Sequence, residues 1–103
     1  WTIIGSSFGG LMGALFTCQR PQQVRKLVLL APALTLPEFA DSLPAPVDVP
    51  TIIIHGTQDD IVPLEQTHRL AAQVFRNLKH HSVEDGHRLE NTAMKLDWQA
   101  LLA

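Results

Sequence analysis

The sequence predicts an α/β fold: a parallel sheet of about four strands, with about four helices distributed over both faces. Short apolar runs alternate with helix-like segments along the 103 residues, as expected where each parallel strand is reached by a crossover. The apolar runs are continuous and not alternating, which indicates strands covered on both faces. The length fits one domain or part of one.

The first part of the chain predicts two strands with a helix between them. Residues 1–4 and 27–31 are apolar runs that indicate short buried strands. The intervening stretch FGGLMGALFT has large apolar residues at helical spacing and small residues on another face. The large residues are Phe8, Leu11, Met12, Leu15 and Phe16, and the small ones are Gly9, Gly10, Gly13 and Ala14. We therefore expect an interior helix whose small face lets another backbone approach closely.

The second part adds two strands and two helices. Residues 51–54 predict a third buried strand, and the polar stretch LKHHSV predicts a fourth strand at a sheet edge. Between them Pro63 opens a helix. Its apolar residues recur at the helical interval and are Leu64, Ala71, Val74, Phe75 and Leu78. A last helix is expected at residues 92–102, with Met94, Trp98 and Leu101 on one face.

Prolines mark the connection between the second and third strands. Five of the seven prolines fall within residues 32–50. This segment is expected to be a short cap or loop with at most one short helix, around residues 36–41. A large lid is therefore not expected.

Composition argues against several classes of function. A net charge of −2 provides no basic surface for a nucleic-acid backbone, and no apolar run approaches the roughly 18 residues of a membrane-spanning helix. The single cysteine, Cys18, allows no internal disulfide and favours a reducing, cytoplasmic location. His80 and His81 belong to opposite faces of a strand, and no phosphate-binding glycine motif is present. We expect no metal, no cofactor, no nucleic-acid partner and no membrane association.

The stretch GSSFGG contains the pattern G-x-S-x-G at residues 5–9. It lies between a predicted strand and a predicted helix, where this pattern forms a nucleophile elbow with its serine at a sharp turn. Ser7 is the candidate nucleophile, and small residues are expected to be needed two positions before and after it. The backbone N–H of Phe8 would donate to a developing oxyanion. The pattern alone also fits a glycine-rich turn whose serine caps a helix.

A serine nucleophile needs a base, and the base needs a carboxylate that orients it. His87 follows Gly86 after the fourth predicted strand, and Asp59 lies in the turn after the third. Loops at the carboxyl ends of parallel strands converge on one crevice. Ser7, Asp59 and His87 are therefore expected to meet there despite their separation in the sequence.

Four segments together resemble the α/β-hydrolase superfamily: GSSFGG, RPQQVRKLVLLAP, PTIIIHGTQDDIVP and DGHRL. They are similar to its elbow, the following strand, its acid loop and its histidine loop, in the superfamily's order of serine, acid and histidine. The resemblance puts the acid three residues after the glycine of H-G-x-x-D, which favours Asp59 over Asp60. It covers residues 1–103 and implies a partial α/β-hydrolase fold, the carboxyl-terminal portion of a single domain.

The resemblance implies a carboxylesterase-like serine hydrolase that cleaves carboxylic esters or related acyl compounds through an acyl-enzyme. The expected partner is a small acyl substrate, with ester, thioester, peptide and carbon–carbon bonds all left open. Serine at the elbow argues against the dehalogenase and epoxide hydrolase relatives, whose nucleophile is aspartate. The alternative is a non-catalytic fragment or binding domain that retains the scaffold.

The amino end begins inside an apolar run at Trp1, without an initiator methionine. This suggests a truncated chain whose first strand has an open edge. The 103-residue chain alone is expected to self-associate through that edge. It is also expected to be a poor catalyst, because a second oxyanion donor would lie upstream.

Overall fold

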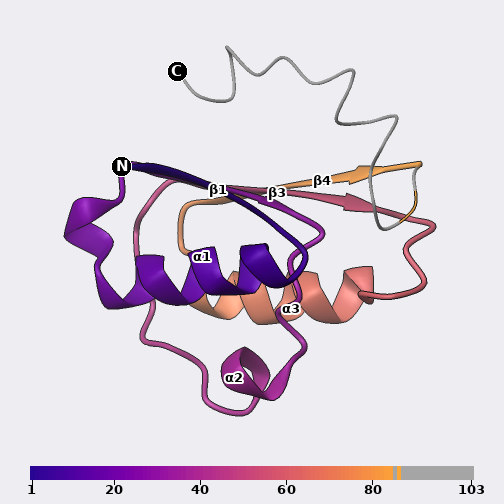
Figure 1. Cartoon of the computed structure of the whole chain (residues 1–103), viewed down its shortest axis with the longest axis horizontal. Helices are drawn as coiled ribbons and strands as arrows, with labels where there is room; N and C mark the ends of the chain where they lie inside the picture. Colours follow the sequence, from indigo (N-terminus) through magenta and orange to yellow (C-terminus); the bar gives the residue numbers. More distant parts are fainter. Residues whose placement is uncertain (85, 87–103) are drawn as a thin grey trace.

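The computed structural model describes residues 1–84 and residue 86, and these residues form a four-stranded parallel sheet (Figure 1). The strands are β1 (Thr2–Ser6), β2 (Lys26–Leu30), β3 (Thr51–Gly56) and β4 (Leu78–Val83). Each strand pairs with the next one in the chain, in the order β1-β2-β3-β4. The predicted parallel α/β fold is confirmed, and the polar strand β4 lies at an edge of the sheet.

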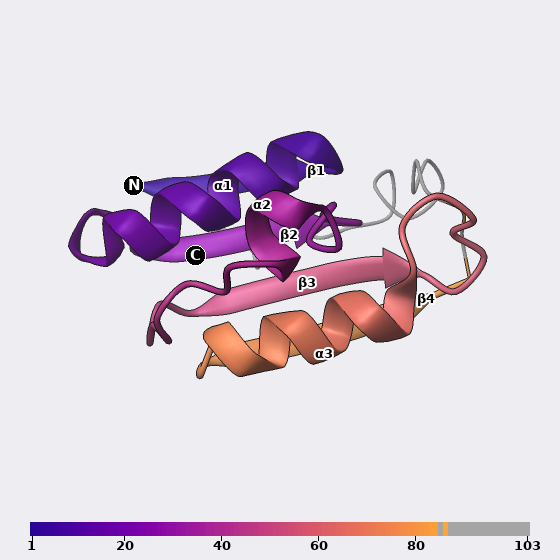
Figure 2. The same cartoon turned by 90° about the horizontal axis from the view of Figure 1, so that it is seen from below.

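The described helices are α1 (Phe8–Gln19), the 3₁₀ turn η1 (Pro21–Gln23), α2 (Pro37–Ala40) and α3 (Leu64–Val74). The α-helices all lie on one side of the sheet (Figures 1 and 2). This follows from the strand order, because right-handed crossovers in a sheet that grows in one direction put every connecting helix on the same face. The helix predicted at residues 92–102 lies outside the described residues, so a helix on the opposite face stays a prediction.

None of these described helices has the length and apolar character that crossing a lipid bilayer requires.

Helix α1 turns mainly its small residues toward the sheet. Its buried positions are Gly10, Leu11, Gly13, Ala14 and Thr17. A Cβ added at Gly13 would lie 3.1 Å from Cγ2 of Ile3 on β1, so the small face does permit the predicted close approach. Three of the large residues, Phe8, Met12 and Phe16, are instead 58%, 44% and 40% exposed.

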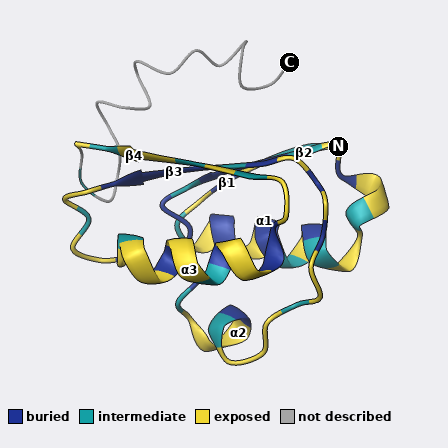
Figure 3. Ribbon diagram, turned by 180° about the vertical axis from the view of Figure 1, so that it is seen from behind, coloured by how far each residue is buried: buried dark blue, intermediate teal, exposed yellow. Residues whose placement is uncertain are grey.

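The main core lies between the sheet and the helices, and the proline-rich segment contributes to it. Figure 3 shows buried residues along the sheet and on the side of each long helix that faces it. Within residues 32–50 the buried apolar side chains are Ala33, Leu34, Phe39, Val47 and Val49. Phe39 of α2 stacks on Phe75, with ring centroids 6.4 Å apart. The segment holds one short helix, as predicted, and it is packed into the core.

Helix α3 is shorter than its apolar periodicity predicted. The pattern extended to Leu78, but the helix ends at Val74 and Leu78 begins β4. The chain becomes extended at Phe75, where φ is −98° and ψ is 101°. The N–H of Val47 donates to the carbonyl of Val74 (2.8 Å), and the N–H of Arg76 donates to the carbonyl of Val47 (3.0 Å). Bonds from the proline-rich segment therefore replace continued helix at this point.

Candidate active site

Ser7 occupies a strained turn between β1 and α1, with φ 53° and ψ −118°. A non-glycine residue in this region costs about 1–3 kcal/mol and persists only where its surroundings hold it. Here the N–H of Ser7 donates to the carbonyl of Leu30 (3.0 Å), and its carbonyl accepts from the N–H groups of Ala33 (2.9 Å) and Leu11 (3.2 Å). Its side chain makes no capping hydrogen bond to α1. The helix-cap alternative therefore does not account for this serine.

Glycines are needed around Ser7, but not at both of the predicted positions. A Cβ at Gly5 would lie 2.5 Å from the carbonyl oxygen of Gly9 and 2.8 Å from Cα of Gly10. A Cβ at Gly9 would meet no described atom within 4 Å, so the expected requirement two positions after the serine is wrong. The constraint lies one residue later, because a Cβ at Gly10 would approach Cβ of Pro32 to 2.9 Å.

Asp59 lies in the loop after β3, and its carboxylate is fully buried. Its Oδ1 accepts hydrogen bonds from the N–H groups of Ile61 and Val62, each at 2.8 Å. Its Oδ2 lies 3.2 Å from Nε2 of His55. Hydrogen bonds from N–H groups to an ionised carboxylate are about twice as strong as those between neutral groups. The neighbouring Asp60 is exposed.

His55, the last residue but one of β3, makes a local hydrogen bond from its Nε2 to the carbonyl of Val62 at 2.9 Å. The same nitrogen also faces the Asp59 carboxylate, which was not predicted from the sequence. The spacing of H-G-x-x-D was the available signal, because it puts the histidine at the end of a strand and the acid in the turn that follows.

Ser7 and Asp59 lie at the same end of the sheet, since each follows the carboxyl end of a parallel strand (Figure 1). Strand β2 separates β1 from β3, and neighbouring strands lie about 4.8 Å apart, so the two strand ends are about 10 Å apart. Such a gap suits one imidazole ring between the two side chains. The predicted base, His87, lies outside the described residues, although β4, the strand before it, pairs with β3.

Phe8, the predicted oxyanion donor, is the first residue of α1. The N–H groups of a first helical turn have no acceptor within their helix. The fold therefore puts a backbone donor directly after Ser7, at the end of the sheet where the candidate nucleophile lies.

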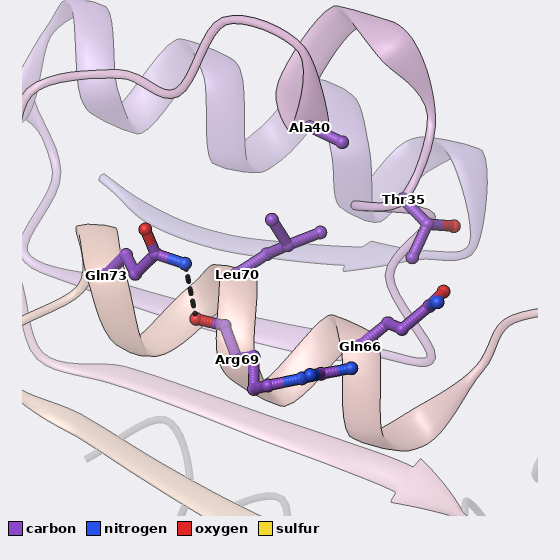
Figure 4. A pocket seen from close by; sticks show the side chains of 6 residues that line it. All are labelled: Thr35, Ala40, Gln66, Arg69, Leu70 and Gln73. Atoms are coloured by element: carbon purple, nitrogen blue, oxygen red, sulfur yellow. Dashed lines mark hydrogen bonds between the residues drawn. The ribbon is translucent and has the colours of Figure 1, made fainter.

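A hollow of about 380 Å³ between α2 and α3 is separate from these residues (Figure 4). It is lined by Thr35, Ala40, Gln66, Arg69, Leu70 and Gln73. Nε2 of Gln73 donates to the carbonyl of Arg69 (3.3 Å) and so uses part of the polar lining. Neither Ser7 nor Asp59 lines this hollow, so we do not include it in the candidate site.

Other candidate residues lack the geometry for catalysis or metal binding. Burial raises the pKa of the Cys18 thiol to about 11, so it stays protonated, and a poor nucleophile, near neutral pH. Within the described part of the chain, no three His, Cys, Asp or Glu side chains are arranged to hold a metal ion. The ring of His80 packs on His68 of α3, with centroids 4.2 Å apart, whereas His81 is exposed.

Comparison with known proteins agrees with the fold described above. The sequence model of the phospholipase/carboxylesterase family matches residues 2–98. An α/β serine hydrolase homologue from Coxiella burnetii is 26% identical, with a TM-score of 0.77 over 96% of this chain and 46% of its own. Est1E from Butyrivibrio proteoclasticus, solved with ferulic acid, is 21% identical, with a TM-score of 0.72 over 98% of this chain and 59% of its own.

A curated protein from Synechocystis sp. that carries the name of a non-heme chloroperoxidase is 47% identical over 49 residues. These residues make up 48% of this chain and 16% of that protein. The chain thus spans about half the length of the solved relatives and less of the curated one. The family match covers nearly all of the chain, and the sheet and the elbow turn agree with it. The chain therefore belongs to the phospholipase/carboxylesterase family of the α/β-hydrolase superfamily.

Proposed function

We propose that this chain carries the catalytic triad of a serine hydrolase that cleaves carboxylic esters or related acyl compounds. Ser7 is the nucleophile, His87 the general base, Asp59 the carboxylate that orients the base, and the Phe8 N–H one oxyanion donor. The chain is the carboxyl-terminal portion of one α/β-hydrolase domain, with residues 32–50 as a short cap or connecting segment. The chemistry needs no cofactor.

The backbone of Ser7 is the observation that carries this proposal. Its positive φ is unfavourable for serine, yet backbone hydrogen bonds on both sides hold it. A turn of this kind exposes the hydroxyl at the top of the sheet, at the end where Asp59 lies. A serine that only capped a helix would have an extended backbone and a bond to the first helical turn.

The proposed reaction has two halves that use the same residues. Oγ of Ser7 attacks the carbonyl carbon while His87 takes the hydroxyl proton, and the Phe8 N–H donates to the oxygen that becomes negative. The intermediate collapses, the carbon–oxygen bond to the alcohol breaks, and His87 returns the proton to the leaving oxygen. Water then attacks the acyl carbon while His87 takes its proton. The bond to Oγ of Ser7 breaks and His87 returns the proton to Oγ, which releases the carboxylic acid and free Ser7.

Asp59 suits the role of orienting residue because its carboxylate is buried and held. Two N–H groups fix Oδ1, and burial shields the charge from solvent, so its attraction for a protonated imidazole is stronger than at the surface. The neighbouring Asp60 is exposed, so solvent screens its charge.

The test is labelling with a fluorophosphonate probe, which reacts only with an activated serine, alongside hydrolysis of a short-chain ester. The full-length natural protein should be labelled at Ser7 and should hydrolyse the ester, and Ser7→Ala should do neither. A folded protein that is not labelled and does not cleave the ester would be the non-catalytic binding domain.

A second measurement asks whether Ser7 and His87 act together. Ser7→Ala and His87→Ala should each remove most ester hydrolysis while leaving the unfolding transition in place. Because triad members act as a unit, the double variant should be little worse than either single one. Clearly additive losses would contradict a shared mechanism.

A further inference from the structure

His55 is fully buried at the carboxyl-terminal part of β3 and has no role in the reaction described above. Its Nε2 lies 2.9 Å from the carbonyl oxygen of Val62 and 3.2 Å from Oδ2 of Asp59. A carbonyl oxygen only accepts hydrogen bonds, so Nε2 carries a hydrogen. That hydrogen is donated to the loop backbone at Val62, and the Asp59 carboxylate lies close to the same N–H group.

These contacts belong to a set that holds the loop between β3 and α3 around Asp59. The N–H of Val62 donates to Oδ1 of Asp59, and the carbonyl of Val62 accepts from His55. The N–H of Asp59 donates to the carbonyl of Gly56 (3.2 Å), directly after the histidine. The loop from β3 to α3 is thus tied to the strand through one imidazole ring.

The other ring nitrogen shows that packing does not explain this histidine. Nδ1 of His55 is buried and has no hydrogen-bond partner among the residues that the structure describes. A buried polar atom without a partner destabilises the folded state. Phenylalanine would fill nearly the same space without such an atom. The favourable contacts of His55 are therefore those of Nε2, with Val62 and Asp59.

We infer that His55 is a positioning residue that holds the plane of the Asp59 carboxylate, an inference that rests on the proposed function. The two N–H donors on Oδ1 fix one oxygen, and the Nε2–H group that lies 3.2 Å from Oδ2 attracts the other oxygen and so opposes rotation of the carboxylate. A carboxylate with a fixed plane offers its remaining lone pairs in one direction. Orientation of His87 requires this, because small misplacements of reacting groups are costly.

The test compares four variants of the full-length protein in ester hydrolysis. His55→Phe keeps the volume and removes the donor, and it should lower kcat about 10- to 100-fold with little change in KM. His55→Gln has a donor near the position of Nε2 and should recover most of the loss, whereas His55→Asn is too short and should not. Thr51→Val is the matched control, because it removes another buried side-chain hydrogen bond in β3, to the carbonyl of Val49, and should leave kcat unchanged.

A double variant separates positioning from simple stability. When Asp59 is already Asn, His55→Phe should cause little further loss of kcat, since the carboxylate that it positions is gone. Fully additive losses would overturn the inference. If His55→Phe does not fold, equal kcat values for the Gln and Asn variants overturn it instead. Should Asp59→Asn alone leave turnover intact, the proposed triad fails, and that outcome is distinct from either of the others.

Discussion

Gly5 and Gly9 are equivalent in the pattern G-x-S-x-G, but their surroundings differ. Gly5 is buried beneath the first turn of α1, and any Cβ there would overlap backbone atoms of that turn. Gly9 is exposed on the outer side of the helix, with open space around it in the described structure. The tight approach of strand to helix therefore depends on Gly5 and Gly10.

Alanine at these two positions should have opposite effects. Gly5→Ala forces backbone apart, so it should destabilise the protein by about 2 kcal/mol or more and reduce esterase activity with it. Gly9→Ala should leave stability unchanged or raise it by up to about 1 kcal/mol, because alanine favours helix over glycine. Urea unfolding of both variants measures this, and equal destabilisation would show that the packing around the elbow is not as described.

Substitutions of the two adjacent aspartates, Asp59 and Asp60, should also differ in their effect on esterase activity. Asparagine at residue 59 keeps the shape but favours the wrong imidazole tautomer, a defect that costs about 10⁴-fold in a serine protease. Asp59→Asn should therefore cause a much larger loss of kcat than Asp60→Asn. If the change at the exposed Asp60 proves the more damaging, the acid is assigned to the wrong residue.

At the scale of single residues, the sequence predicted those features of the site that depend on neighbouring residues in the chain. A serine between small residues, after a strand and before a helix, is sufficient to predict the turn at Ser7. The burial of Asp59 was not predictable from the sequence. It depends on how the loop after β3 folds, which brings the carboxylate against His55 and the N–H group of Val62. The role of His87 stays a prediction, since His87 lies outside the described part of the chain.

At the scale of elements, periodicity predicted where helices and strands occur better than where they end. The two faces of α1 were visible in the sequence, but which one meets the sheet is decided by its partners. Ile3 already fills the space beneath the helix, so Gly13 fits there and a larger side chain does not. The end of α3 likewise depends on bonds from Val47, which is distant in sequence.

The contact between His68 of α3 and His80 of β4 should make the free energy of unfolding depend on pH. Burial, and then the nearby His68, His55 and His81, lower the pKa of His80 to about 4. The unfolded chain has an ordinary histidine pKa of about 6.5 and binds this proton first. The free energy of unfolding should therefore fall as the pH drops from about 6.5 to about 4, and this contribution should level off below that range.

His80→Asn should reduce this slope, which urea unfolding at a series of pH values would measure. Because His80 is partly exposed, solvent screening limits the difference to about 1 kcal/mol. His81→Asn, on the exposed face of the same strand, removes only the smallest of these causes and should reduce the slope much less. Equal slopes in the wild type and the His80 variant would show that this contact does not control the pH response.

At the scale of the whole molecule, apolar surface gathers around β1 and α1. In the described part of the chain β1 pairs only with β2, so its other edge has unpaired backbone groups. Trp1 is 81% and Ile4 46% exposed, and Phe8, Met12 and Phe16 of α1 are exposed as well. An edge of this kind is a template for pairing with a second chain.

The 103-residue chain produced alone should therefore associate with itself, and the full-length protein should be both less associated and more active. The isolated chain is expected to be less active because it would lack the second oxyanion donor, and loss of one such donor typically costs about 10²- to 10³-fold in turnover. Ile4→Lys should shift the isolated chain toward monomer in sizing chromatography, since a charge on an edge strand opposes pairing. Leu43→Lys, which replaces an exposed leucine outside the sheet, should not. A monomeric isolated chain as active as the full-length protein would contradict this view of the edge.

The order of the strands also has a consequence for how the protein is made. Each pairing joins residues about 25 positions apart, so at about 5–20 residues per second the ribosome delivers a new strand every few seconds, always to the growing edge. The bonds that hold Ser7 come from Leu30 and Ala33, and they can form once β2 has docked. His87 is translated more than 50 residues after Ala33. The turn at Ser7 can therefore form early in synthesis, and a nascent chain that uses the proposed triad could not hydrolyse an ester until His87 has been added.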